Sequence, residues 1–318
     1  MCNRASKIEP FEVVVPGSTA NLGPGFDSIG MALNVFTTVR VERAHTTRVV
    51  LHGDNLTGLP ADETNLIVQV MQKCFAARGE ALPSLAVHVW SDIPMTRGLG
   101  SSAAALAAGL VAANELLGGA FSMDELLQLG TAWEGHPDNI GASLLGGVVI
   151  GSWDGRRAAV VQADPPPLPV VVAIPEYELS TTEARDALPG ELPFREAILS
   201  SSRANVLTAA LLTGRWGLLP AAMQDTFHHP YRGRLVPGLA DMLAAANRHG
   251  AQGIALSGAG PTLLAFAQSG EEERLAHYLE ETFTRHGTRA HIRHLTPWAQ
   301  GATVQRGSHA IDTEKRTV

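Results

Sequence analysis

Short apolar runs with the alternation of strands are spaced along the chain between longer segments of helical period. A period of two is typical of strands, and apolar residues at every third and fourth position are typical of helices. In the first half, the strand-like runs cover residues 11–16, 35–42, 47–52, 85–90 and 144–150. The helical segments cover residues 63–78, 103–117 and 122–134. The last of these begins with Ser122 and Glu125, which have the spacing of a capping box.

A proline-rich segment, Asp164-Pro-Pro-Pro-Leu-Pro169, separates this half from the next and indicates a linker. Beyond it, strands are expected at 170–174, twice within 253–267, and at 290–295, with helices near 182–187, 194–212, 238–249 and 271–286. We therefore expect an α+β protein with one domain over residues 1–163 and another over 164–300. Residues 301–318 are polar and aperiodic, which predicts a mobile tail.

Composition limits the kinds of partner. The 318 residues are 45% hydrophobic and 17% charged, with a formal net charge of −7. A mildly acidic chain lacks the basic surface of a nucleic-acid binder and the clustered Lys and Arg of a membrane-surface protein. We find no pattern of a signal peptide or a transmembrane helix. A cytoplasmic enzyme and a cytoplasmic binding protein both remain compatible.

The two cysteines, Cys2 and Cys74, have no partner at metal-ligand spacing. Two free thiols in a reducing compartment are the interpretation that these positions favour.

A glycine loop, Pro94-Met-Thr-Arg-Gly-Leu-Gly-Ser-Ser-Ala-Ala104, joins a predicted strand to an alanine-rich helix. Gly98 and Gly100 allow sharp backbone turns and close approach of a ligand. Free N–H groups and the positive end of the helix dipole then point into the loop, which makes a site for a phosphate anion. The loop has neither the Walker A lysine nor the spacing of a dinucleotide-binding fingerprint.

This loop resembles the phosphate-binding motif of the GHMP kinases. Two further blocks resemble the same superfamily in the expected order: Pro16-Gly-Ser-Thr-Ala-Asn-Leu-Gly-Pro-Gly-Phe-Asp27 and Ser257-Gly-Ala-Gly-Pro-Thr262. The resemblance implies the GHMP fold. An N-terminal domain like ribosomal protein S5, with a left-handed βαβ unit, would precede a C-terminal ferredoxin-like α+β domain.

The form of several segments is similar to the homoserine kinase branch of this superfamily. These are Ala20–Asp27 in the first block, Glu134-Gly-His-Pro-Asp-Asn139, Ser180-Thr-Thr-Glu-Ala-Arg185 and Phe227-His-His-Pro-Tyr-Arg232. Glu134 and His136 stand closer together here than the equivalent residues do in some relatives. The resemblance implies transfer of the γ-phosphate of ATP to L-homoserine, a step of threonine biosynthesis, by a homodimer.

The resemblance also assigns residues. Those expected to bind ATP are Asn65, near the adenine, and Pro94, Met95, Thr96, Arg97, Gly98, Leu99, Gly100, Ser101, Ser102, Ala103 and Ala104. Arg97 could lend charge to the phosphates or point to water. Mg²⁺ would be held by Ser102 and Glu134.

Residues expected to bind homoserine are Asn21, Asp27, His136, Asn139, Thr181, Arg185 and Arg232, with Arg234 as the alternative to Arg232. His136, Asp138 and Asn139 are the catalytic candidates, and Asp138 has the chemistry of a base. A guanidinium pairs well with a carboxylate, and a carboxylate with an ammonium, so the set suits a zwitterion with one hydroxyl. The competing hypotheses are a GHMP kinase for mevalonate, a sugar or a shikimate-type alcohol, a non-catalytic GHMP-fold binding protein, and an acidic interaction module.

Overall fold

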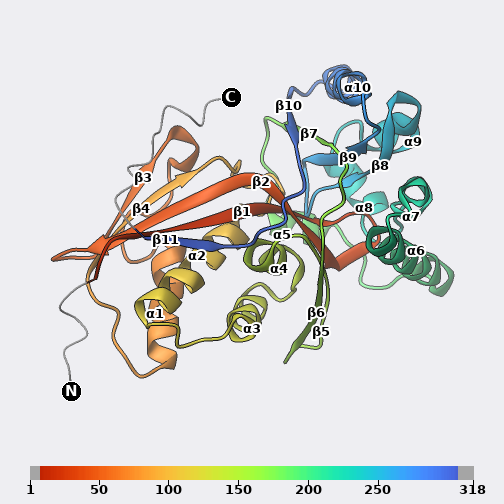
Figure 1. The fold of residues 1–318 in the computed structure, drawn as a ribbon. Helices are drawn as coiled ribbons and strands as arrows, with labels where there is room; N and C mark the ends of the chain where they lie inside the picture. Colours follow the sequence, from red (N-terminus) through yellow and green to blue (C-terminus); the bar gives the residue numbers. More distant parts are fainter. Residues whose placement is uncertain (1–7, 307–318) are drawn as a thin grey trace.

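The computed structural model describes residues 8–306 and contains two sheets (Figure 1). The first is seven-stranded, with β11 (Thr303–Arg306), β1 (Phe11–Asn21), β2 (Gly25–Arg43), β4 (Leu85–Ser91) and β3 (Arg48–His52) in that order. From β2 it continues through β5 (Val148–Trp153) to β6 (Ala158–Ala163). The pair β3 and β4 is parallel and is joined through α1 (Leu66–Ala77), as a βαβ unit requires.

Helices cover one face of this sheet: α1, α2 (Ser101–Leu116), α3 (Met123–Glu134) and α4 (Asp138–Leu145) (Figure 1). α2 is buried along most of its length because alanines and Gly109 let it pack closely against α1 and β1. The predicted capping box at the start of α3 is present, with Ser122 and Glu125 exchanging both hydrogen bonds.

The second sheet is four-stranded and antiparallel, in the order β10 (Ala290–Leu295), β7 (Val170–Pro175), β9 (Leu263–Ala267) and β8 (Ala251–Leu256). It packs against α9 (Leu239–Ala245) and α10 (Glu272–Arg285). The remaining helices are α5 (Thr181–Asp186), α6 (Phe194–Thr213), α7 (Leu219–Ala222) and α8 (His229–Arg232), with one-turn 3-10 segments at 54–56, 216–218, 233–235 and 246–249.

Strand β7 connects the two hydrophobic cores. Val170 and Val172 pack into the core that includes the first sheet, whereas Val171 and Ala173 pack into the core under α10. Because side chains alternate between the faces of a strand, a run of apolar residues is what a strand buried on both sides needs. Residues 170–174 are all apolar because β7 is buried on both of its faces.

The α+β class expected from the sequence is confirmed. Several details differ from the sequence prediction. Strand β6 and the short helices α7 and α8 were not expected, and β2 begins at Gly25 instead of residue 35. The strand expected from residue 144 begins at Val148, because α4 occupies Asp138–Leu145. The mobile tail expected from residue 301 begins with β11, which pairs with β1, and residues 307–318 lie outside the described part.

Within residues 8–306, no helix is long and apolar enough to cross a bilayer. Cys74 is a free, buried thiol on α1, and burial raises its pKa to about 11, so it is poorly reactive at neutral pH. Cys2 lies outside the described residues.

Candidate functional site

One cavity of about 660 Å³ collects residues from every motif identified in the sequence. The glycine loop and α2, the connector between α3 and α4, the turn after β1, α5, α8 and the turn between β8 and β9 all contribute to it. The predicted site residues that line it are Asn21, Asp27, Asn65, Met95, Thr96, Gly98, Gly100, Ser101, Ser102, Ala103, Glu134, His136, Asp138, Asn139, Thr181, Arg185 and Arg232.

Four predicted nucleotide-binding residues do not line this cavity: Pro94, Arg97, Leu99 and Ala104. Leu99 and Ala104 are fully buried beneath the loop. Arg97 donates from Nε to the carbonyl of Pro175 at 3.0 Å and from Nη2 to that of Glu176 at 2.6 Å. Its guanidinium therefore fastens the glycine loop to the end of β7, which differs from both roles expected for it.

The two glycines of the loop are required by conformation and by space. Gly98 has φ 79° and Gly100 has φ 73°, in the left-handed region that favours glycine. A Cβ on Gly98 would lie 2.2 Å from the carbonyl oxygen of Ser257, and one on Gly100 would lie 2.2 Å from Ser18 Oγ. The first and third sequence blocks thus press against the loop and fix its shape.

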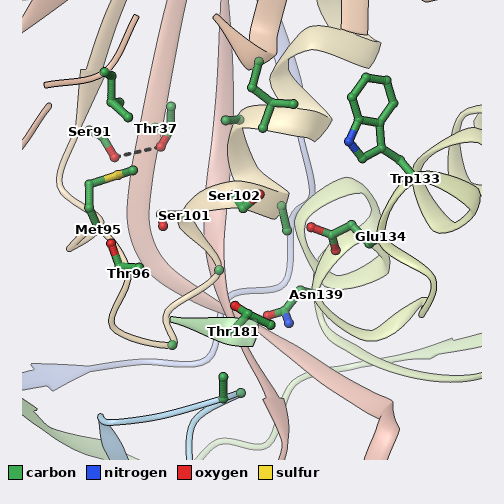
Figure 2. Close-up of a pocket in the computed structure, with 18 of the residues that line it drawn as sticks. Thr37, Ser91, Met95, Thr96, Ser101, Ser102, Trp133, Glu134, Asn139 and Thr181 are labelled. Carbon is green, nitrogen blue, oxygen red and sulfur yellow. Dashed lines mark hydrogen bonds between the residues drawn. The ribbon is translucent and has the colours of Figure 1, made fainter. Parts of the chain in front are cut away.

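Helix α2 begins directly after Gly100, which caps it without a side-chain hydrogen bond. Its first N–H groups and the positive end of its dipole are therefore free to bind an anion. Ser101 and Ser102 add hydroxyls at the same end, and both line the cavity (Figure 2). The geometry is that of a phosphate site.

Glu134 is the last residue of α3, and Gly135, with φ 85°, ends the helix there. Its Oε2 is buried and has no hydrogen-bond partner within residues 8–306. Burial raises the pKa of Glu134 to about 7, although the charge of His136 opposes that rise. Figure 2 shows the carboxylate directed into the cavity opposite α2. An unpaired carboxylate oxygen facing a serine hydroxyl and a phosphate site fits Mg²⁺, which prefers oxygen ligands.

His136 and Asp138 form a tight pair, with 2.6 Å between Nδ1 and Oδ1. Burial alone would lower the pKa of His136, but the hydrogen bond and the charge of Asp138, with smaller effects of Asp27 and Glu134, raise it to about 9. The imidazole is therefore a cation at neutral pH. Asp138 Oδ1 also accepts from the N–H of Asn139 at 2.7 Å, so the carboxylate is already engaged.

Asn139 lies on the first turn of α4 and accepts a 3.0 Å hydrogen bond from Ser18 Oγ at its Oδ1. Ser18 belongs to β1 and is fully buried. The bond orients the Asn139 amide so that its Nδ2 remains available to the cavity, which Asn139 lines (Figure 2).

Asp27 and Arg185 face each other across the cavity and form an ion pair. Arg185 donates from Nη1 and Nη2 to the two carboxylate oxygens at 3.0 and 2.9 Å. Asn21 and Asp27 flank the turn between β1 and β2, and the Asn21 amide stabilises it. Its Oδ1 accepts from the N–H of Asp27, and its Nδ2 donates to the carbonyl of Gly258. Asn21, Leu22 and Asp27 all have positive φ, a strained arrangement that is commonly found at functional sites.

Arg232 is the second arginine that lines the cavity, and it is only 2% exposed. Burial, helped by the charge of Arg185, lowers its pKa to about 10, so it stays protonated at neutral pH. Its Nε donates to the carbonyl of Ala184 at 3.0 Å, and its Nη1 to that of Gly258 at 3.1 Å. Arg234, the alternative candidate, is exposed and lines a shallow depression outside the cavity.

The far end of the cavity is apolar. It is lined by Leu51, Leu56, Leu59, Pro60, Leu66, Ile67, Val89 and Met95. Asn65 lines this end, and its amide is committed within the fold: Nδ2 donates to the carbonyl of Pro60, and Oδ1 accepts from the N–H of Ile67 and caps α1. Asn65 therefore shapes this end of the cavity by holding α1.

Sequence reasoning missed several lining residues. Thr37 and Ser91 place two hydroxyls 2.8 Å apart on neighbouring strands (Figure 2). Trp133 lies one residue before Glu134, and Ala259 is in the turn after β8. Polar residues in otherwise apolar strands were the signal for Thr37 and Ser91, whereas the other two carried none.

Comparisons with known proteins agree with this architecture. The description "GHMP kinases N terminal domain" matches residues 65–147, and "GHMP kinases C terminal" matches residues 207–285. The chain belongs to the GHMP kinases, and the GHMP kinase fold expected from the sequence is confirmed.

Individual relatives define the branch. Homoserine kinase from Deinococcus radiodurans is 43% identical over 95% of this chain and 99% of its own length. Homoserine kinase from Bacillus licheniformis is 47% identical over 86% of this chain and 90% of its own. The crystal structure of homoserine kinase from Cytophaga hutchinsonii superposes with a TM-score of 0.83 at 28% identity, covering 94% of this chain and 98% of that one. Within the GHMP kinases, this chain belongs to the homoserine kinase family.

Proposed function

We propose that this protein transfers the γ-phosphate of ATP to the hydroxyl of L-homoserine and forms O-phospho-L-homoserine, a step of threonine biosynthesis. The observation that carries the proposal is the make-up of one cavity. It holds a phosphate site with an unpaired carboxylate on one side and a set of opposed charges for a zwitterion on the other.

The nucleotide occupies the glycine loop in this proposal. Its phosphates lie against the first turn of α2, where Ser101 and Ser102 and the free N–H groups face the cavity. The base extends into the apolar end, where Leu56, Leu59 and Met95 exclude water.

Mg²⁺ would be held by the Ser102 hydroxyl and the Glu134 carboxylate, and it would neutralise charge on the phosphates. The fit rests on Glu134 Oε2, a buried oxygen without a partner in the described chain. Leaving such an oxygen unpaired costs stability unless a ligand satisfies it.

The acceptor is oriented by residues of the α3–α4 connector and α4. Asn139 keeps its amide donor for the hydroxyl, since Ser18 occupies its oxygen. His136 lies beside Asp138 and carries a positive charge. This positive charge opposes the negative charge that spreads over the transferring phosphoryl group. Phosphoryl transfer requires positioning and charge neutralisation more than a strong base, so Asp138 acts mainly by holding His136 and Asn139.

Homoserine binds between the charged side chains. Its ammonium forms an ion pair with Asp27, and its carboxylate forms ion pairs with Arg232 and Arg185. The ion pair between Asp27 and Arg185 must therefore break when the substrate enters. Thr181, at the start of α5, lines the same part of the cavity.

A coupled assay of ADP release tests the proposal, with phosphorus NMR to identify the product. We expect turnover with L-homoserine and far less with L-serine, mevalonate, galactose or shikimate. Faster turnover with one of the others would make the protein a different GHMP kinase. Nucleotide binding without turnover of any of them would indicate a non-catalytic binding protein.

A homodimer formed through α6 is also proposed. Phe194, Ile198 and Leu212 on this helix are 81%, 52% and 49% exposed, and Leu199 and Val206 add to the same surface. No exposed charge interrupts the helix between Glu196 and its end at Thr213. The helix lies at the outer edge of the molecule (Figure 1). Arg203, the one charged residue after Glu196 on this helix, is half-buried and donates to Gln224. The exposed apolar side chains of α6 suit an identical face related by a two-fold axis.

The domain limits 1–163 and 164–300 stay predictions, although β11 returns to the first sheet. A cytoplasmic location also stays a prediction.

A further inference from the structure

The buried side chain of His228 lies behind the cavity, between Arg232 and the turn that follows β1. Its Nδ1 is 3.2 Å from Arg232 Nη1, and its Nε2 is 3.0 Å from the carbonyl oxygen of Gly23. A guanidinium can only donate, so Nδ1 must accept, and the proton must then be on Nε2, which donates to Gly23. Burial lowers the pKa of His228 to about 3, which agrees with a neutral ring.

Neighbouring residues keep this ring in place. Asp225 accepts hydrogen bonds from the N–H groups of Phe227, His228 and His229 at 2.7, 2.8 and 2.7 Å, which fixes the first turn of α8. His229 Nε2 accepts from the N–H of Leu256 at 3.1 Å. Asp225, His228 and His229 are close enough to suggest a metal site, but both nitrogens of His228 are already used.

The contact with His228 completes the hydrogen bonds of the Nε and Nη1 groups of Arg232. Nε donates to Ala184, and the two hydrogens of Nη1 go to Gly258 and His228. Nη2 takes part in none of these bonds, and Arg232 lines the cavity. Through Gly23, the same imidazole is tied to the turn that carries Asn21 and Asp27.

We infer that His228 is a positioning residue that sets the distance between the carboxylate-binding Arg232 and the ammonium-binding Asp27. The inference rests on the proposed homoserine kinase function. A fixed spacing between the two opposite charges selects an α-amino acid, in which carboxylate and ammonium share one carbon. His228 acts through Arg232 and through Gly23, and the substrate does not touch it.

Two amide variants separate its two bonds. In His228→Asn the amide oxygen stands where Nδ1 was, so the acceptor for Arg232 is kept and the bond to Gly23 is lost. In His228→Gln the amide reaches the place of Nε2, so the bond to Gly23 is kept and the acceptor for Arg232 is lost. The control is His229→Gln, whose amide oxygen can still accept from Leu256 in an equally buried place.

Steady-state kinetics with L-homoserine and with its amide are the measurement, together with the melting temperature. We expect His228→Gln to raise the KM for homoserine about tenfold or more, which corresponds to about 1.4 kcal/mol. The KM for ATP should change less than twofold, and the KM for the amide should not rise. His228→Asn, which loses the bond to Gly23 and so frees the turn, should also raise the KM for homoserine, by about threefold or more. His229→Gln should lower the melting temperature without changing the KM.

A wild-type protein that does not phosphorylate homoserine overturns the proposed function, and the role of His228 with it. With an active wild type, equal rises in KM for His228→Gln and His229→Gln, or equal rises for homoserine and its amide, overturn the role of His228 alone. If His228→Gln does not fold, an unchanged KM for homoserine in His228→Asn overturns the role of His228 as well.

Discussion

Asp27 and Arg185 are joined by two hydrogen bonds of 2.9 and 3.0 Å between the start of β2 and α5. Both line the cavity, and both side chains are partly exposed, at 32% and 45%. A partly exposed pair is only weakly stabilising, because water screens its charges. The pair can therefore separate at small cost when a zwitterion offers each partner a new one.

Asp27→Asn and Arg185→Gln should each raise the KM for L-homoserine about tenfold or more and leave the KM for ATP within twofold. Each removes one charged contact with the substrate. The double variant should show less than the product of the two effects, since contacting residues are not independent. Steady-state kinetics of the four proteins provide the test.

Arg234→Gln is the matched control, because Arg234 is exposed and outside the cavity. It should leave both KM values unchanged. If it raised the KM for homoserine as much as Arg185→Gln does, the carboxylate site would have to move toward Arg234.

Gly100→Ala should destabilise the protein more than Gly118→Ala. Both glycines have nearly the same φ, 73° and 71°, so both variants bear the left-handed strain of about 1–2 kcal/mol. A Cβ on Gly100 meets Ser18 Oγ at 2.2 Å, whereas one on Gly118 has nothing within 4 Å. The extra crowding should cost roughly 1–3 kcal/mol more, measured as the free energy of unfolding in urea. Equal costs would mean that the loop can shift away from β1.

Local patterns sufficed to predict the elements whose signals lie within one segment. The helices α1, α2, α3 and α10 have long apolar periods or caps of their own. The glycine loop was visible because positive φ and close approach both demand glycine. Residues of the three separate blocks line the same cavity.

The missed features depend on partners that are distant in the sequence. Strand β11 forms because β1 offers an unpaired edge nearly 300 residues earlier in the chain, which no pattern within residues 303–306 reveals. Helix α4 is only eight residues long, and its apolar residues read equally well as the start of a strand. The sequence pointed to Asp27 and Arg185 one at a time, but only the structure shows that the two form an ion pair.

Ile198→Glu should convert the proposed dimer to a monomer. The substitution places a charge among the exposed apolar side chains of α6, where an identical helix would have to bury it. Sedimentation equilibrium at several concentrations measures the mass. Val161→Glu, at a 57% exposed residue on β6, is the control and should remain dimeric. A wild-type protein that sediments as a monomer at all concentrations would contradict the proposed interface.

Glu134→Gln should lower kcat by two orders of magnitude or more, because a neutral amide binds Mg²⁺ poorly and the transition state loses charge stabilisation. The pH dependence of Mg²⁺ activation should identify the same residue. With a pKa of about 7, the Glu134 carboxyl is largely protonated below neutral pH, so Mg²⁺ must displace a proton to bind. The Mg²⁺ concentration for half-maximal rate should therefore rise about tenfold for each pH unit below 7 and level off above it.

Without metal, the stability of the folded protein should change with pH in the opposite direction to Mg²⁺ binding: it falls as the pH rises. Because burial raises the pKa of Glu134 from 4.5, the protonated carboxyl favours the folded state, and its contribution to stability is lost as the pH rises through about 7. Glu134→Gln should remove that loss. Glu125→Gln is the control on the same helix: it keeps the capping geometry, since Gln also serves in a capping box, and should leave kcat and the Mg²⁺ dependence unchanged. A Mg²⁺ requirement in Glu134→Gln that matches the wild type at every pH would place the metal on Asp138 instead.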